Sequence, residues 1–359
     1  MAIPAQAVIT DGKGRFRVES ILVGPPQAGE VRVDLKASGV CHTDHKFLFR
    51  RKLQILGHEG AGVVRDVGRG VRRVKPGDRV LLNWAIPCGR CFQCQRGAEN
   101  ICERPPEVPA ARFRWKGRPV PTAFRLGTMS TTTVVPEAAC VPIGVPIPDP
   151  SACILGCGVM TGYGSVMNVA QVKRGESVAV IGTGGVGLSV IQGARIARAK
   201  TIVGIDLNPA RLRMARRFGA THTIRARRTD AGLLRAAGRA RALCEGRGAD
   251  YAFECTSVPA LCAAPLAFVR HGGTAVQLSG TEEPVTVNFE LFEWDKVYIN
   301  PLYGRCRPAV DMPKLLDLYA KGKLLLDEMV TRTYPIGRVH EAFDDMLSGR
   351  NAKGVLVMS

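Results

Sequence analysis

The sequence predicts an α/β protein in which a β-rich domain with a cysteine lobe is followed by a doubly wound parallel sheet. Three observations predict this fold class. The first 80 residues alternate short apolar runs with glycine and proline, a pattern typical of antiparallel strands joined by tight turns. Four cysteines then fall within residues 88–102. From about residue 160, near-continuous apolar runs alternate with segments of helical spacing, which indicates parallel strands covered on both faces.

The expected elements follow in chain order. CHTD at residues 41–44 is expected to open a helix, and the last part of the chain reads as two amphipathic helices and a terminal strand, GVLVM. A polar, proline- and arginine-rich loop is expected up to about residue 126. Strands are predicted at residues 31–35, 61–68, 79–84, 177–182, 201–206, 249–256 and 274–280.

Composition excludes several classes of protein. The chain has 359 residues, of which 46% are hydrophobic and 23% charged, as in ordinary globular proteins rather than disordered or collagen-like chains. No apolar run approaches the roughly 18–20 residues of a membrane helix, and the N-terminus lacks the regions of a signal peptide. We therefore expect a cytoplasmic protein, in which 12 cysteines indicate metal or thiol chemistry before disulfides.

The net charge of +19 raises the question of a nucleic-acid partner or an anionic substrate. The basic residues are scattered, and their densest group is the run of Arg225, Arg227 and Arg228. Aromatic residues make up only 6% of the chain and do not interleave with the basic ones. An arginine-rich surface is thus favoured, and a basic zinc-ribbon nucleic-acid-binding protein is kept as the alternative of another class.

Cys88, Cys91, Cys94 and Cys102 form the pattern C-x2-C-x2-C-x7-C. Tight turns at this spacing let four thiolates converge on one ion, which is the typical closed structural zinc site. An iron–sulfur cluster is the rival interpretation, because thiolates also hold those clusters. The sequence favours zinc.

A second, dispersed set consists of Cys41 in GVCHTDHK, His58 in ILGHEGAG and Cys157 in ILGCGVMTGYG. Two thiolates and a neutral imidazole around zinc leave the fourth coordination position open, which is the design of a catalytic site. Each residue alone is weak evidence, so the prediction depends on the three together.

A glycine-rich turn lies between the predicted strand at 177–182 and a helix. Glycines there allow close approach to a pyrophosphate at the helix N-terminus. Asp206 ends the next predicted strand, and an acid at that place accepts hydrogen bonds from the adenine ribose and repels a 2′-phosphate. NAD is therefore favoured over NADP. The residues of the turn are Gly182, Thr183, Gly184, Gly185, Val186 and Gly187.

Together these motifs resemble the zinc-dependent medium-chain alcohol dehydrogenases over nearly the full chain, and most closely the class that includes glutathione- and mycothiol-dependent formaldehyde dehydrogenases. The resemblance implies a GroES-like catalytic domain at residues 1–159, to which 301–359 return, and a Rossmann NAD-binding domain at 160–300. It also implies a homodimer built through the nucleotide domain.

The resemblance further implies roles for individual residues. Cys41, His58 and Cys157 match the catalytic zinc ligands, and the four-cysteine set matches the structural ones. Asp44 matches a carboxylate that orients the histidine ligand, Glu59 an acid beside the zinc, and Trp84 a position lining the substrate pocket. Residues matching positions on the cofactor are His42, Thr161, Arg211 and Lys353.

The implied reaction is reversible hydride transfer between a primary alcohol, or its aldehyde, and NAD. Thr43 is expected to accept the alcohol proton and pass it on through the cofactor ribose. Relatives often end this relay with a histidine where this chain has Lys46; His45 lies one residue earlier, so Lys46, His42 or water remain alternatives. Oxidation of a thiol adduct of formaldehyde is the main alternative reaction, and a protein that keeps NAD tightly bound is a third.

Overall fold

The computed structural model describes residues 1–358, which form two compact units. Unit 1 comprises Met1–Cys157 and the chain from Arg307 onward, and unit 2 comprises Gly158–Cys306. Residues 301–306 thus fall in unit 2 rather than with the C-terminal segment. The reason is close packing of the Tyr303–Arg305 turn on helix α4 (Gly158–Gly164), where a Cβ added to Gly164 would lie 2.6 Å from the Gly304 carbonyl oxygen.

Unit 1 contains two sheets, as the alternating apolar runs predict. The five-stranded sheet has the order β4-β1-β2-β7-β8, and the seven-stranded sheet has the order β10-β6-β5-β3-β18-β17, with β9 also paired to β3. All pairs are antiparallel except β17–β18, which is parallel. The strands are β1 Ile3–Thr10, β2 Phe16–Val23, β3 Glu30–Gly39, β4 Gln54–Ile55, β5 Gly60–Val67, β6 Arg79–Leu82, β7 Phe113–Trp115, β8 Arg118–Pro119, β9 Thr132–Pro136, β10 Cys140–Pro142, β17 Val330–Pro335 and β18 Lys353–Val357.

Strand β3 is at the centre of unit 1. Val31, Val33 and Leu35 are fully buried in its largest apolar core, because alternate residues of a strand share one face. The strand that joins β3 to β17 is β18, from the C-terminal end of the chain. The helices of this unit are α1 His42–Phe47, α2 Phe92–Gln95, α3 Asp149–Cys153, α9 Pro308–Ala320 and α10 Val339–Leu347.

The region expected to be a loop up to residue 126 is more ordered than the sequence suggests. It contains β7 and β8, and β7 pairs with β2. Arg112 forms an ion pair with Glu30 at 2.8 Å, and Arg125 forms one with Glu107 at 3.4 Å. These two arginines are therefore engaged within the fold.

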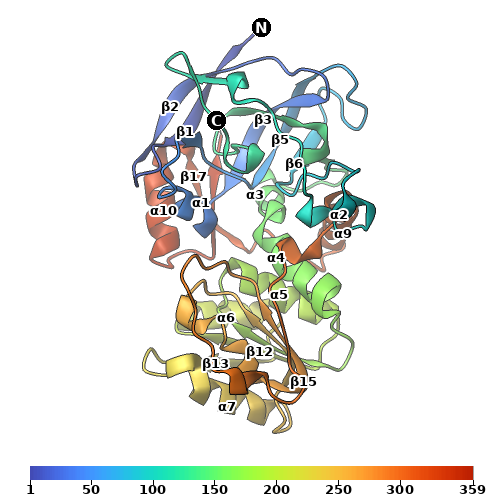
Figure 1. The fold of residues 1–359 in the computed structure, drawn as a ribbon, viewed down its shortest axis with the longest axis vertical. Coiled ribbons are helices and arrows are strands. Elements are labelled where there is room, and N and C mark those ends of the chain that lie inside the picture. The colour runs from blue at the N-terminus through green and yellow to red at the C-terminus, as the bar shows by residue number, and fades with distance from the viewer. Residues whose placement is uncertain (359) are drawn as a thin grey trace. The chain divides into compact units, whose positions relative to one another are not determined.

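Unit 2 is built on one six-stranded sheet of order β13-β12-β11-β14-β15-β16, in which every pair is parallel. Figure 1 shows α5, α6 and α7 packed around β12, β13 and β15. The central strands β11 and β12 bury both faces, as their continuous apolar runs predict. The elements are α4, β11 Ser177–Ile181, α5 Gly185–Ile196, β12 Thr201–Asp206, α6 Pro209–Phe218, β13 His222–Arg225, α7 Leu234–Leu243, β14 Ala249–Glu254, α8 Pro265–Phe268, β15 Val269–Gln277 and β16 Val297–Ile299.

Across residues 1–358, no single helix is long and apolar enough to cross a membrane. The consecutive helical segments Asp149–Gly156 and Gly158–Ala170 meet that criterion only when taken as a pair.

Candidate metal centres and dinucleotide turn

The four cysteines of the lobe converge. Cys91 immediately precedes α2, Cys102 follows the short turn Glu99–Ile101, and all four sulfur atoms lie within 4.8 Å of one another. The Cys91 N–H donates to Cys88 Sγ and the Cys88 N–H to Cys102 Sγ, each at 3.3 Å. Backbone hydrogen bonds, first among them one at Cys94, lower the pKa of the Cys91 thiol to about 6. Sulfur atoms so placed fit a tetrahedral thiolate site.

A second cluster brings together residues far apart in the sequence. Cys41 is the residue that precedes α1, His58 lies between β4 and β5, and Cys157 immediately precedes α4. The ligand atoms of these three residues and of Glu59 lie within 4.8 Å of one another. The structure thus assembles the dispersed set that the sequence singled out.

Glycines next to two of these residues permit the assembly. Gly57 has φ +100°, and a Cβ there would lie 2.2 Å from a backbone nitrogen. A Cβ on Gly156 would lie 2.9 Å from the Leu82 carbonyl oxygen. Larger residues would therefore displace the backbone that carries His58 and Cys157.

Asp44 fixes the imidazole of His58. Its Oδ1 lies 2.9 Å from His58 Nδ1 and accepts a hydrogen bond from the Gly57 N–H at 3.2 Å. Both side chains are buried. Burial lowers the pKa of His58, but the Asp44 carboxylate more than offsets this, so the pKa is raised well above its ordinary value.

The other ring nitrogen, His58 Nε2, is buried and has no hydrogen-bond partner among the described residues. Buried polar atoms are nearly always paired, so an orphaned imidazole nitrogen beside two sulfur atoms calls for a ligand. A histidine that ligates a metal through one nitrogen and is held by a carboxylate through the other is a recurrent arrangement.

The two thiols of the cluster shift each other's pKa in opposite directions. Contact with Cys157 lowers the pKa of Cys41 well below its usual value, whereas contact with Cys41 and burial raise the pKa of Cys157. A divalent cation bound here would hold both sulfur atoms as thiolates. The residues present therefore fit a metal with two thiolate ligands and one imidazole ligand.

Glu59 forms a buried ion pair beside this cluster. Its Oε1 lies 2.6 Å from Lys353 Nζ, which also donates to the Val40 carbonyl oxygen at 3.0 Å. Burial raises the pKa of Glu59 to about 7 even though the Lys353 ammonium opposes the shift. Lys353, which the resemblance assigns to the cofactor, is thus held against Glu59 in this structure.

Replacing Asp44 with asparagine should weaken metal binding at the second cluster by roughly 10- to 100-fold, a typical cost of losing a carboxylate behind a histidine ligand. Competition with a zinc chelator would measure it. Asp34→Asn, at a surface ion pair with Arg65, is the control. Equal zinc retention by both variants would contradict the role of Asp44.

The remaining polar residues of α1 differ in their surroundings. Thr43 is half-buried in the first turn, one residue after the exposed His42. The His45 ring packs beside Phe49 and Phe343, with centroid distances of 5.4 and 6.4 Å. His45 is therefore placed among aromatic rings of unit 1.

An aromatic cluster covers the His58 ring, and its central member, Phe124, was not predicted from the sequence. The Phe124 ring centroid lies 4.7 Å from that of His58, 5.3 Å from Trp84 and 5.0 Å from Phe47. Phe124 has φ +50°, which costs of order 1 kcal/mol for a bulky residue. The Phe124 and His58 rings are tilted by 36°, and this contact of a strained aromatic residue with a candidate ligand depends on the tertiary structure, which the sequence does not reveal.

In unit 2 the glycine-rich turn has the geometry that the motif predicts. Gly182 has φ +86°, and α5 begins at Gly185 with Gly184 as its N-cap residue. A Cβ on Gly187 would lie 1.9 Å from the Gly182 carbonyl oxygen, so only glycine lets the helix start this close to the strand. The backbone N–H groups at this helix N-terminus suit an anion.

Asp206 ends β12 beside this turn. Its carboxylate accepts hydrogen bonds from the Thr183 N–H at 2.8 Å and the Asn208 N–H at 2.9 Å. Arg211 lies on α6, and its Nε is buried without a hydrogen-bond partner in the described part of the chain. Of the other predicted cofactor residues, Val186 is in α5 and Thr161 is half-buried in α4.

Comparisons with known proteins agree with these features. The alcohol dehydrogenase GroES-like domain matches residues 27–149, and the zinc-binding dehydrogenase family matches residues 185–321. The chain is 34% identical to the class-3 alcohol dehydrogenase of Myxine glutinosa, over 98% of this chain and 96% of that protein. It is 33% identical to the S-(hydroxymethyl)glutathione dehydrogenase of Paracoccus denitrificans, over 99% of this chain and 100% of that protein.

A solved structure of benzyl alcohol dehydrogenase from Acinetobacter calcoaceticus superimposes with a TM-score of 0.90 at 26% identity, over 99% of this chain and 100% of that chain. The chain belongs to the zinc-dependent alcohol dehydrogenase family. It is therefore an oxidoreductase with a GroES-like and a Rossmann portion, and its cofactors are zinc and NAD. The zinc-ribbon nucleic-acid-binding alternative is set aside.

Proposed function

We propose that this enzyme transfers hydride reversibly between an aromatic primary alcohol and NAD, with a catalytic zinc ion held by Cys41, His58 and Cys157. The observation that carries the proposal is the convergence of two thiols and one unpartnered buried imidazole nitrogen. Three protein ligands leave a coordination position for substrate. The four-cysteine lobe would hold a second, structural zinc ion through Cys88, Cys91, Cys94 and Cys102.

Bound zinc supplies Lewis acidity toward the alcohol oxygen, and bound NAD accepts the hydride. The protein's own groups orient the zinc ligands and deprotonate the alcohol. Asp44 holds the His58 ring, and Glu59 with Lys353 sets the charge beside the ligands. Thr43, two residues after Cys41, would accept the proton of the alcohol hydroxyl and pass its own proton on through the cofactor ribose.

The dinucleotide would bind to unit 2 through its glycine-rich turn and Asp206. The turn's N–H groups would receive the pyrophosphate, and Asp206 would accept hydrogen bonds from the adenine ribose. Further contacts are proposed for His42, Thr161, Gly182, Gly184, Gly185, Val186, Gly187, Arg211 and Lys353.

The aromatic cluster over His58 supports an aromatic substrate. Trp84 and Phe124 present rings beside a candidate zinc ligand, and rings stack on rings in offset or edge-on arrangements. Trp84→Ala should raise the KM for benzyl alcohol about tenfold, since an aromatic contact of roughly 1–1.5 kcal/mol is lost. Trp115→Ala, at a partly buried indole outside the cluster, is the control, and an unchanged KM in Trp84→Ala would contradict the assignment.

The test of the whole proposal is a screen of NAD reduction by the zinc-loaded enzyme. Aliphatic, aromatic and terpenoid alcohols are compared with formaldehyde, with and without glutathione or mycothiol. We expect turnover with aromatic primary alcohols. A signal only with formaldehyde plus a thiol would replace this proposal by the thiol-adduct reaction, which the Paracoccus relative's name favours. Absorbance of NADH in the purified protein would reveal tightly held cofactor.

We also propose a cytoplasmic homodimer. All 12 cysteines are free, as expected in a reducing compartment. Edge strand β16 and its flanks expose Trp294 by 65%, Val297 by 51% and Leu302 by 49%, and such apolar exposure at a sheet edge suits pairing with a second copy. Light scattering would measure the oligomeric state.

A further inference from the structure

Helix α10 carries a buried carboxylate that the candidate site does not include. Asp345 is 3% exposed, and its Oδ2 accepts hydrogen bonds from the Tyr334 hydroxyl and from Arg332 Nη1, each at 2.6 Å. Its Oδ1 pairs with Arg350 Nε at 2.7 Å. The Tyr334 hydroxyl, with the guanidinium groups, holds the pKa of this carboxyl below its ordinary value. Asp345 thus joins β17, α10 and the turn that follows α10.

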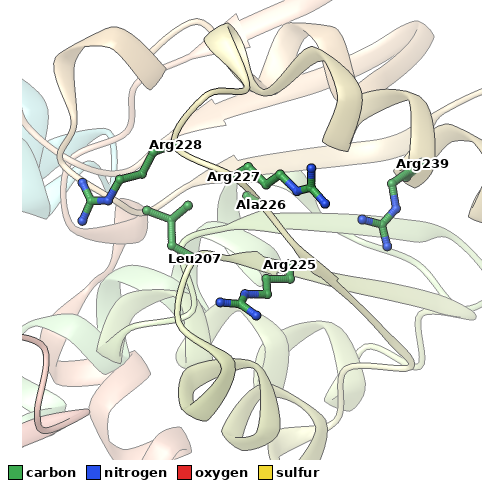
Figure 2. A pocket seen from close by; sticks show the side chains of 6 residues that line it. All are labelled: Leu207, Arg225, Ala226, Arg227, Arg228 and Arg239. Atoms are coloured by element: carbon green, nitrogen blue, oxygen red, sulfur yellow. The ribbon is translucent and has the colours of Figure 1, made fainter.

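Two guanidinium groups on one carboxylate are not a simple result of the composition. The chain has 50 Lys and Arg residues against 31 Asp and Glu residues, so not every cation can have a carboxylate partner. Figure 2 shows arginines of the opposite kind, which line a cavity in unit 2 and form no ion pair with any described residue. These are Arg225, Arg227, Arg228 and Arg239. The pairing at Asp345 is therefore a specific arrangement.

The network around Asp345 continues to the start of β18. The Tyr334 hydroxyl accepts a hydrogen bond from Asn351 Nδ2 at 3.1 Å, and both side chains are buried. A Cβ added to Gly354 would lie 2.9 Å from Asn351 Nδ2 and 3.1 Å from Tyr334 Cε2. The partners of Asp345 therefore pack directly on the residue that follows Lys353.

A β-bulge lies beside the same point. The pairing of β17 with β18 shifts register between Val330 and Arg332, which makes Thr331 the extra residue. Its hydroxyl accepts a hydrogen bond from the Ala352 N–H at 3.0 Å and donates to the Lys353 carbonyl oxygen at 3.4 Å. Bulges re-aim side chains next to active sites, and this one fixes the backbone from which the Lys353 side chain extends.

The Lys353 ammonium has one donor to spare. It donates to Glu59 Oε1 at 2.6 Å and to the Val40 carbonyl oxygen at 3.0 Å, and an ammonium has three N–H groups. Within residues 1–358 the third has no hydrogen-bond partner, and the side chain is 11% exposed. The structure thus holds the ammonium firmly and leaves one N–H for a ligand.

We propose that Asp345 is a positioning residue for cofactor binding, which through Tyr334 and Asn351 fixes the start of β18 and so directs the Lys353 ammonium. Among the described residues, Asp345 has no hydrogen bond to Lys353 or Glu59, so it acts through the backbone. The inference rests on the proposed contact of Lys353 with NAD and extends it to residues outside the candidate site.

The first experiment measures how well Lys353 is held. The zinc-loaded full chain is treated with an amine-acylating reagent, and the rate at each lysine is read by peptide mass spectrometry, with the exposed Lys36 as reference. In Tyr334→Phe the ratio of the Lys353 rate to the Lys36 rate should rise about fivefold, because losing a buried hydrogen bond lets the start of β18 open more often. Asp345→Asn should raise it too; if that variant does not fold, Tyr334→Phe decides.

The matched control is Asp250→Asn in unit 2. Asp250 is also a carboxylate held by one hydroxyl and one guanidinium group, Ser177 Oγ and Arg270 Nε, each at 2.7 Å. Its loss should leave the Lys353 ratio unchanged. An unchanged ratio in both Tyr334→Phe and Asp345→Asn, or an equal rise in the control, would overturn the proposal.

The second experiment is a double-mutant cycle on NAD affinity, measured by titration calorimetry. Tyr334→Phe should weaken NAD binding about threefold when Lys353 is present and leave it unchanged in the Lys353→Met background, since the two substitutions then remove the same contact. An equal loss in both backgrounds would mean that the network acts without Lys353 and would overturn the proposal.

Unchanged NAD affinity in Lys353→Met alone would remove Lys353 from the cofactor contacts, and with it the role of Asp345 in cofactor binding. Acylation and NAD binding are both measured without alcohol. A failure of either prediction is therefore distinguishable from a failure of the proposed alcohol oxidation.

Discussion

The variant Cys157→Ala is expected to contain one zinc ion per chain instead of two and to lose alcohol oxidation by roughly 10³-fold or more. Cys157 supplies one of the two sulfur atoms of the catalytic cluster, and a Lewis acid stabilises the charge of the transition state by several kcal/mol. Metal analysis and NAD reduction measure the two effects. The four-cysteine lobe is untouched, so its zinc ion should remain.

The matched control is Cys140→Ala. Cys140 is buried and belongs to neither cluster, and burial raises the pKa of its thiol. This variant should keep both zinc ions and full turnover. Wild-type turnover by Cys157→Ala would show that the cluster is not the catalytic metal site.

The second large effect is expected at the ion pair of Glu59 and Lys353. Lys353→Met should lower the free energy of unfolding by about 1–3 kcal/mol, because it leaves a fully buried carboxyl group without its hydrogen-bonding partner. Loss of the ammonium should also raise the pKa of Glu59 further, so that this group is neutral at pH 7. Denaturant titration of the zinc-loaded protein measures the change.

A double-mutant cycle separates the ion pair from general packing. In Glu59→Gln the carboxylate is gone, so adding Lys353→Met should cost much less than it does in the wild type. If Lys353→Met lowers the free energy of unfolding equally in both backgrounds, then the methylene chain of Lys353, rather than its charge, stabilises the protein.

Much of the fold follows from local patterns in the sequence. The apolar runs at 177–182 and 201–206 are β11 and β12, and CHTD opens α1, because strand burial and helix spacing are properties of neighbouring residues. Strand β16 and the hairpin of β7 and β8 are short. The place of the hairpin in its sheet depends on the pairing of β7 with the distant strand β2, which no local pattern encodes.

Part of the candidate site could likewise be predicted from the sequence, and part of it could not. Ligand types and spacing point to Cys41, His58 and Cys157, because zinc restricts its donors to few residue types. The left-handed backbone of Phe124 over His58 and the contact of Lys353 with Glu59 depend on the tertiary structure, so local sequence patterns do not predict them.

Strand β18 has a consequence for biosynthesis. It lies between β3 and β17 and carries Lys353, the partner of Glu59, yet in the chain it follows both β3 and Glu59 by a long interval. In a nascent chain, β3 and the Glu59 carboxyl group are therefore synthesised long before β18, their neighbouring strand, and Lys353, the cation that pairs with Glu59. Chains that stop before residue 353 would leave an open sheet edge and an unneutralised carboxyl group beside the metal ligands, so unit 1 is complete only once β18 has been translated.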